Sequence, residues 1–185
     1  MAIRVLENPE IRKLISPVSV KSYRTLCDLG ILSKKTELIE GVVIDKITKS
    51  PALTYYSDLF FEVLLKIKPE NCILRTEKPL TLKNSEPEPD LMLVQGTLQE
   101  YRKKNPTSAL LVVEIANTSL SADREKIRIY AEALVENYWM VDIQSKQIET
   151  YHSPIQEDYS FKKTYTQNEK IPIFEGIIDL SILFE

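Results

Sequence analysis

The chain has 185 residues, of which 43% are hydrophobic and 28% charged, and its net charge is -3. This size and composition suit one globular domain with an ordinary core and exclude a disordered or fibrous protein. The net charge gives no overall attraction to nucleic acid. No apolar run approaches the length of a membrane span, and no apolar signal core follows Met1, so we expect a cytoplasmic protein with no membrane partner.

The first half of the chain predicts two helices with strand-forming residues between them. A helix is expected over residues 18–29, with a serine in the cap position and a glycine at the end. Residues 37–48, ELIEGVVIDKIT, are rich in β-branched side chains and broken by Gly41, which predicts one bent strand or a tight pair of strands. Pro51 then opens a strongly apolar helix that ends before Pro69.

The second half predicts strands around one buried strand. LLVVEIA, residues 110–116, is apolar throughout except for Glu114, which is typical of a central strand buried on both faces. A helix over residues 121–135 follows, with acids in its first turn. Other strands are expected at residues 72–77, 79–83, 90–94, 138–143, 147–152 and 159–166, before a tail from Ile171. This order predicts an α/β fold in which one mixed sheet is flanked by helices, in a single domain over residues 1–185 with residues 1–17 as a peripheral segment.

Several common kinds of site are excluded by missing residues. The four glycines form neither a GxGxxG motif nor a P-loop, so a backbone cradle for nucleotide phosphates is not expected. The single histidine, His152, excludes a zinc site with several histidines and has no GxSxG motif to complete a catalytic triad. Cys27 and Cys72 lie far apart in no metal-binding spacing, so we expect both to be small buried apolar residues.

Asp90 and Glu114 are the candidates for chemistry. Asp90 begins one strand and Glu114 lies near the end of a later strand, so antiparallel pairing would bring both carboxylates to one edge of the sheet. Two carboxylates at one point repel unless they share a proton or hold a divalent cation, for which Mg²⁺ or Mn²⁺ is the natural candidate. The short loop after Glu114 leads to a helix whose first turn contains Asp123 and Lys126. Two acids, a divalent cation and Lys126 would suit phosphodiester hydrolysis.

The same residues also have structural interpretations. Asp90 could be a turn residue at a strand entry, and Glu114 could be a buried ion-pair partner of Lys126, because ion-pair networks resemble active sites. The aromatic pair Tyr138-Trp139 favours a place in the core over a base-stacking surface. The residues alone leave the choice between site and ion pair open.

Three segments together resemble the Uma2 family of restriction endonucleases: ELIEG, EPDLMLV and LVVEIANTSLSADREKIRIYAEALVENYWMVD. They occur in the family's order, within residues 18–152. The family is similar to the PD-(D/E)xK nuclease superfamily, which implies a restriction-endonuclease-like fold and metal-dependent cleavage of DNA. On this resemblance, Pro89-Asp90 matches the PD element, Glu114 the second acid and Lys126 the lysine of the following helix. Glu37 matches an acid that could complete the metal shell.

The resemblance implies an endodeoxyribonuclease that uses Mg²⁺ or Mn²⁺, with Asp90 and Glu114 as metal ligands and DNA as substrate. The superfamily's usual lysine lies two positions after the second acid, where this chain has Ala116, so activity depends on Lys126 acting in its place. Cutting both strands of a duplex would favour a two-fold homodimer. The alternatives are a non-catalytic relative that binds DNA or protein, and a small-molecule hydrolase that uses Glu114 as acid or base.

Overall fold

A computed structural model describes residues 8–46, 48–116 and 120–185. The helices are α1 (Pro9–Arg12), α2 (Val20–Asp28), α3 (Pro51–Ile67), α4 (Leu120–Glu132) and α5 (Leu180–Leu183). The strands are β1 (Thr36–Ile39), β2 (Val42–Asp45), β3 (Cys72–Thr76), β4 (Leu91–Gln95), β5 (Leu111–Ala116), β6 (Asn137–Asp142), β7 (Gln147–Ile155), β8 (Asp158–Thr166), β9 (Lys170–Ile173) and β10 (Gly176–Asp179). Among these residues, none of the helices combines the length and apolar character that crossing a bilayer requires.

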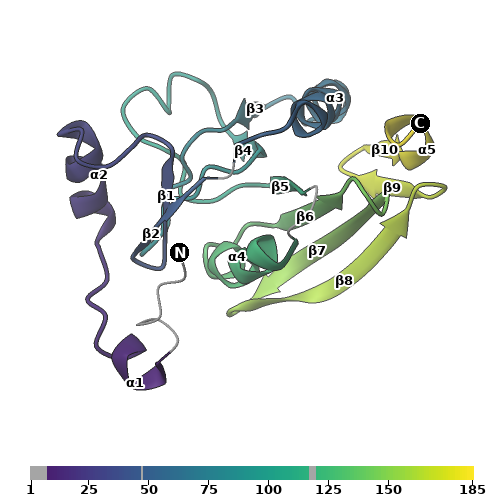
Figure 1. Ribbon diagram of the computed structural model, residues 1–185. Coiled ribbons are helices and arrows are strands. Elements are labelled where there is room, and N and C mark those ends of the chain that lie inside the picture. The colour runs from purple at the N-terminus through teal and green to yellow at the C-terminus, as the bar shows by residue number, and fades with distance from the viewer. Residues whose placement is uncertain (1–7, 47, 117–119) are drawn as a thin grey trace.

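The strands β3 to β8 form one six-stranded mixed sheet in sequence order (Figure 1). The pair β5–β6 is parallel, because α4 carries the chain back between them, and every other neighbouring pair in this sheet is antiparallel. Strand β5 lies inside the sheet and all six of its residues are buried. The predicted mixed sheet flanked by helices is therefore confirmed.

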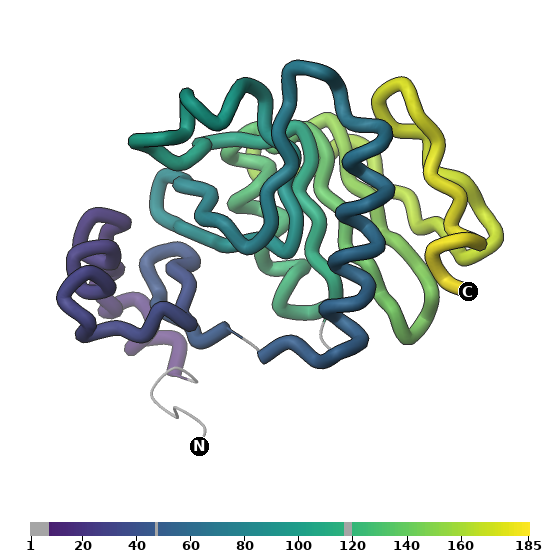
Figure 2. The backbone as a smooth tube through the Cα atoms, turned by 90° about the horizontal axis from the view of Figure 1, so that it is seen from above, coloured from purple at the N-terminus to yellow at the C-terminus, as the bar shows by residue number. Residues whose placement is uncertain are grey.

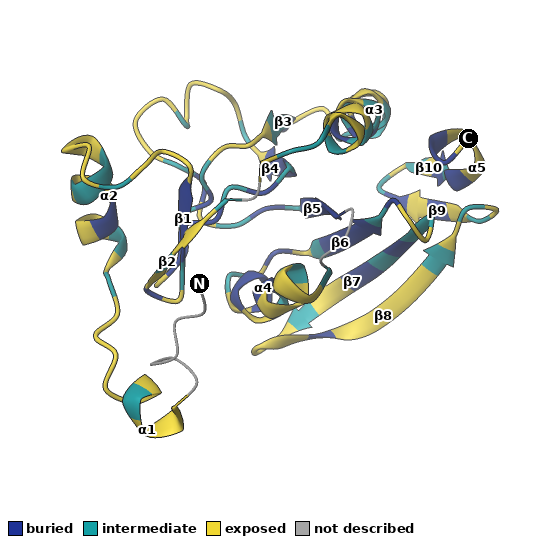
Figure 3. Ribbon diagram, viewed as in Figure 1, coloured by how far each residue is buried: buried dark blue, intermediate teal, exposed yellow. Residues whose placement is uncertain are grey.

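Each face of the sheet carries its own apolar core. Val113 and Trp139 face the side of α3 and α5, whereas Val112 and Tyr138 face the side of α4. Adjacent residues divide in this way because successive side chains of a strand point to opposite faces. Figure 3 shows the buried strands between these helices, and Figure 2 shows α3 lying over the sheet. The expectation that Tyr138-Trp139 belongs to the core is confirmed.

The N-terminal elements form a smaller unit beside the sheet, as Figure 2 shows. Strands β1 and β2 make an antiparallel hairpin whose turn residues Glu40 and Gly41 have φ of 51° and 78°, the left-handed pair that a tight two-residue hairpin needs. Arg24 of α2 donates from Nε to both carboxylate oxygens of Glu86. Because Glu86 is 4% exposed, this ion pair ties α2 firmly to the segment that leads into Asp90.

Two predictions about local structure are wrong. Residues 79–83 form no strand, because their N–H groups donate to loop carbonyls: Leu80 to Pro87 and Leu82 to Ser85. Both leucines are buried. The alternation of apolar and polar residues in PLTLK therefore reflects burial and not pairing with a neighbouring strand. Cys72 is buried as expected, but Cys27 is only half-buried, because α2 lies at the periphery.

Candidate active site

Asp90 and Glu114 lie side by side where β4 begins and β5 ends. Strand pairing places Leu91 opposite Val113. Asp90, which precedes Leu91, therefore lies opposite Glu114, which follows Val113. The Asp90 N–H donates to Glu114 Oε2 at 3.4 Å, and the Ile115 N–H donates to Asp90 Oδ2 at 2.6 Å. Antiparallel pairing brings the two carboxylates together, as the sequence predicts.

Lys126 reaches the same place from the buried face of α4. Its Nζ lies 3.0 Å from Glu114 Oε1, 3.4 Å from Glu37 Oε2 on β1, and 3.8 Å from Asp123 Oδ1. The Tyr130 hydroxyl, one helical turn further on, donates to Glu114 Oε1 at 2.8 Å. The structure therefore gathers Glu37, Glu114 and Lys126 from three separate parts of the chain, and all three are buried.

Lys49 is a second cation of this cluster, and the sequence analysis did not identify it. It lies between the β1–β2 hairpin and α3, and its Nζ is 2.6 Å from Asp90 Oδ1 and 2.5 Å from Glu77 Oε1. Burial opposes its charge, but Asp90 and Glu77 together raise the pKa of Lys49. No local pattern marks this lysine, because the contact depends on how the hairpin lies against the start of β4.

Burial and mutual repulsion shape the electrostatics of the cluster. Burial and then the Glu114 carboxylate raise the pKa of Asp90, against the lowering effect of Lys49 and the Ile115 N–H. The same two causes raise the pKa of Asp123 to about 7. Burial alone would lower the pKa of Lys126, but the carboxylates of Glu114, Glu37 and Asp123 outweigh it and the net pKa is raised. Lys126 therefore stays an ammonium among acids that are present in excess.

Comparison with known proteins identifies the family and the fold of the chain. The family described as "Uma2: Putative restriction endonuclease" matches residues 21–184. The chain belongs to the Uma2 family. Among solved structures, one similar chain is described as a putative nuclease belonging to DUF820, from Anabaena variabilis ATCC 29413. The match has a TM-score of 0.74 at 16% identity and covers 91% of this chain and 98% of that one, so the two share a fold. None of the curated proteins matches.

Ala116 of β5 lies where a lysine would also face α4. Ala116 and Glu114 are two residues apart on β5, so their side chains share one face of the strand. A lysine at position 116 would therefore project towards α4. In this chain the ammonium comes to Glu114 from the opposite direction, from Lys126 of α4, at 3.0 Å. An ammonium therefore lies next to Glu114, although it comes from α4 and not from position 116 of β5.

The donor set of this Uma2 cluster fits a hard divalent cation. Asp90, Glu114 and Glu37 offer only carboxylate oxygens, which Mg²⁺ and Mn²⁺ prefer, and the buried Glu37 Oε2 makes no hydrogen bond, with only the Lys126 ammonium 3.4 Å away. Across the described ranges, no three acidic, histidine or cysteine side chains already stand together as a metal-binding group. Ligation by Asp90 and Glu114 would therefore require these side chains to rearrange.

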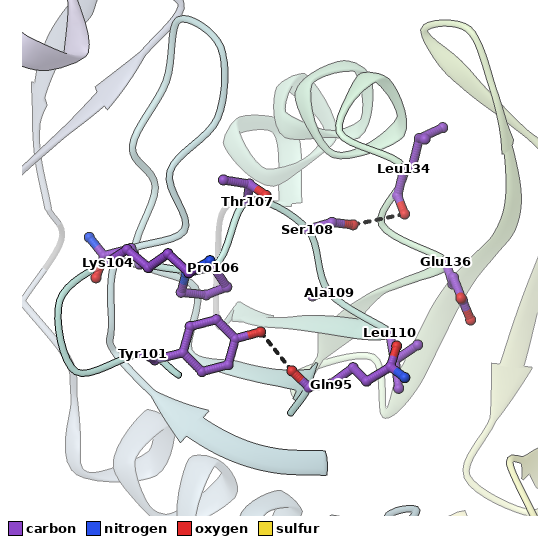
Figure 4. Close-up of a pocket in the computed structure, with 11 residues that line it drawn as sticks. Gln95, Tyr101, Lys104, Pro106, Thr107, Ser108, Ala109, Leu110, Leu134 and Glu136 are labelled. Carbon is purple, nitrogen blue, oxygen red and sulfur yellow. Dashed lines mark hydrogen bonds between the residues drawn. The ribbon is translucent and has the colours of Figure 1, made fainter. Parts of the chain in front are cut away.

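A surface pocket of about 290 Å³ lies elsewhere on the molecule (Figure 4). It is lined by Gln95 at the end of β4 and by Ala109 and Leu110 just before β5, which is the opposite end of these strands from Asp90 and Glu114. The Ser108 hydroxyl donates to the Leu134 carbonyl across it at 3.0 Å. The pocket contains none of the candidate residues, so it offers no support for a small-molecule hydrolase that uses Glu114.

Proposed function

We propose that this Uma2 chain is an endodeoxyribonuclease that requires Mg²⁺ or Mn²⁺ and hydrolyses phosphodiester bonds of DNA. The observation that carries the proposal is the convergence of Asp90, Glu114 and Lys126, with Glu37 beside them, at one end of the central strands. Membership of a family described as "Putative restriction endonuclease" supports DNA as the substrate. We take the whole chain as one nuclease domain, and a two-fold dimer would present two such sites to the two strands of a duplex.

In this proposal Asp90 and Glu114 hold the metal and Glu37 assists them. The bound metal supplies a Lewis acid for the scissile phosphate and lowers the pKa of a water molecule. The Ile115 N–H holds Asp90 Oδ2 and the Tyr130 hydroxyl holds Glu114 Oε1, so each carboxylate would keep one anchored oxygen while the side chains rearrange around the metal.

Lys126 has the role of a positioned cation in the hydrolysis. A water oxygen bonds to phosphorus as the bond from phosphorus to the leaving sugar oxygen breaks, and a proton from the water reaches the leaving oxygen through solvent. Because Lys126 remains charged among buried acids, its ammonium donates to the attacking water or to the phosphate oxygens on which negative charge develops. It does not serve as the base.

The test is cleavage of supercoiled plasmid DNA by the purified protein in Mg²⁺, in Mn²⁺ and with a chelator. We expect Asp90→Asn, Glu114→Gln and Lys126→Met each to lower the nicking rate by about 100-fold or more, the usual effect of removing a group that stabilises developing charge. Glu125→Gln and Lys103→Met are matched controls, because both residues are exposed, and should cut as the wild type does. Absence of metal-dependent cleavage over varied DNA sequences would count against the proposal.

One observation favours the non-catalytic alternative. Asp90 is paired with Lys49 and Glu114 with Lys126, so the acids are compensated within the protein without a metal. A module of this kind would bind duplex DNA in a gel-shift assay with a chelator present, and its melting temperature would not change on addition of Mn²⁺. The nuclease requires the opposite response to Mn²⁺.

A further inference from the structure

Lys49 occupies the oxygen of Asp90 that a metal would need. Of the two carboxylate oxygens, Oδ2 accepts the Ile115 N–H at 2.6 Å and Oδ1 lies 2.6 Å from Lys49 Nζ. An ammonium and a divalent cation cannot both lie against the same carboxylate oxygen without strong repulsion between like charges. Metal ligation by Asp90 therefore has to remove Lys49 from its present position.

We propose that Lys49 is a built-in counter-cation that competes with the divalent metal for Asp90 and, once released, binds a phosphate of the DNA. This inference rests on the proposed function, because it concerns the metal site of that nuclease. It assigns Lys49 a role that neither the family resemblance nor the sequence pattern provides. It also makes metal and DNA binding depend on each other.

The two lysines of the cluster differ in how easily they can leave. Lys126 lies among three acids with a side chain that is 10% exposed, whereas the side chain of Lys49 is 26% exposed. Lys49 also has a second partner, since Glu77 Oε1 lies 2.5 Å away with a side chain that is 58% exposed. Release from Asp90 would leave the ammonium paired with Glu77 at the surface, so no buried charge would be stranded.

The surroundings of Lys49 suit a phosphate. The positive charges of Lys49, Lys46 and Lys78 all act on Glu77 and lower its pKa, so three lysines lie around Glu77, the second partner of Lys49, on a chain whose net charge is negative. A phosphate that takes Lys49 frees Asp90 for the metal, and a metal that takes Asp90 frees Lys49 for the phosphate. By thermodynamic linkage, each ligand raises the affinity for the other by the same factor.

The first experiment measures Mn²⁺ binding by titration calorimetry without DNA. Removing the competitor in Lys49→Gln should tighten Mn²⁺ binding by about tenfold, which corresponds to about 1.4 kcal/mol. Lys46→Gln is the matched control, because Lys46 pairs with Glu88 and not with Asp90. The affinity of Lys46→Gln for Mn²⁺ should stay close to that of the wild type. Adding Asp90→Asn to Lys49→Gln should abolish the gain, and circular dichroism checks that each variant is folded.

The second experiment measures binding of a fluorescent DNA duplex in a chelator, where no metal is present. Asp90→Asn frees Lys49 and should tighten DNA binding several-fold, and most of that gain should vanish when Lys49→Gln is added. A gain of equal size in both backgrounds would mean only that a negative charge was removed, and it would overturn the role of Lys49 in phosphate binding.

The outcomes separate this inference from the proposed function. Equal or weaker Mn²⁺ binding by Lys49→Gln than by a wild type that binds and cuts would overturn the inference and leave the nuclease intact. If neither protein bound Mn²⁺, both would fall. Tighter binding that requires Asp90 supports the inference even if DNA cleavage is never detected.

Discussion

Lys126 faces three carboxylates, and this excess of acid has a consequence at Asp123. Its Oδ1 lies 3.8 Å from Lys126 Nζ, while Glu114 holds the closer position at 3.0 Å. Burial, followed by repulsion from Glu114, raises the pKa of Asp123 from 3.8 to about 7. A carboxyl group of this kind binds a proton more readily in the folded protein than in the unfolded chain, where it resembles a free aspartate.

We predict that Asp123 makes the folded protein less stable as the pH rises from about 4 to about 7. In that window the folded state keeps the proton that the unfolded state has released, so the free energy of unfolding falls with pH, and below it both states are protonated. In Asp123→Asn this decline should be shallower by on the order of 1 kcal/mol per pH unit. Urea unfolding at several pH values with a chelator present measures both slopes.

The comparison between the two proteins isolates Asp123, because other groups titrate in both. Asp90 contributes a decline of the same sign, since burial and Glu114 raise its pKa as well. Parallel stability curves for wild type and Asp123→Asn would contradict the prediction. They would mean that Lys126 keeps Asp123 ionised in the folded state.

At the scale of elements, the β1–β2 hairpin decides whether Glu37 reaches the site. Gly41 in its turn has a φ of 78°, and a Cβ at this position would lie 2.4 Å from Pro17 Cβ and 2.9 Å from Pro17 Cα. The Val18 N–H also donates to the Gly41 carbonyl at 2.8 Å. The turn is therefore pressed against the segment before α2, and no side chain fits between them.

We predict that Gly41→Ala lowers the free energy of unfolding by about 1–2 kcal/mol more than Gly30→Ala, since overpacking adds a cost of that order. Gly30 is a close control: its φ is 70°, but nothing lies within 4 Å of a Cβ built on it. Both variants bear the strain of a positive φ, and only Gly41→Ala adds the clash. Chemical unfolding measures the difference, and equal losses would show that the hairpin can move away from Pro17.

The elements that the sequence predicted are those with strong periodicity or clear end signals. The helix opened by Pro51 and the buried strand over residues 110–116 are present, and the order of strands was enough to bring Asp90 and Glu114 together. The strand predicted over residues 79–83 is wrong because alternating apolar residues indicate which side chains are buried, and do not show that the segment pairs with another strand. Lys49 and Tyr130 were missed for another reason: their contacts join segments far apart in the sequence, and a lone lysine or tyrosine carries no signal of its partner.

At the scale of the molecule, the candidate site is the place where separate parts of the chain meet. Glu37 comes from the N-terminal unit, Asp90 from the residue before β4, Glu114 from β5 and Lys126 from α4. The attachment of α2 through Arg24 and Glu86 therefore matters to the site, although neither residue touches it. A ligand held by several of these parts should stabilise the whole fold and not one element alone.

We predict that Mn²⁺ raises the melting temperature of the wild type. A ligand that binds only the folded state at about 100 times its Kd adds about 2.7 kcal/mol to the free energy of unfolding. For a chain of this size that gain corresponds to roughly 5–10 °C. Differential scanning calorimetry with increasing Mn²⁺ measures the shift, and Asp90→Asn and Glu114→Gln should each remove most of it.

Lys126→Met separates two roles of the lysine. It leaves Glu114 and Glu37 without their cation, so the variant should have a lower melting temperature than the wild type without metal and a larger increase on addition of Mn²⁺. If Lys126→Met responded to Mn²⁺ no more than the wild type does, Lys126 would not compete with the metal for Glu114 and Glu37.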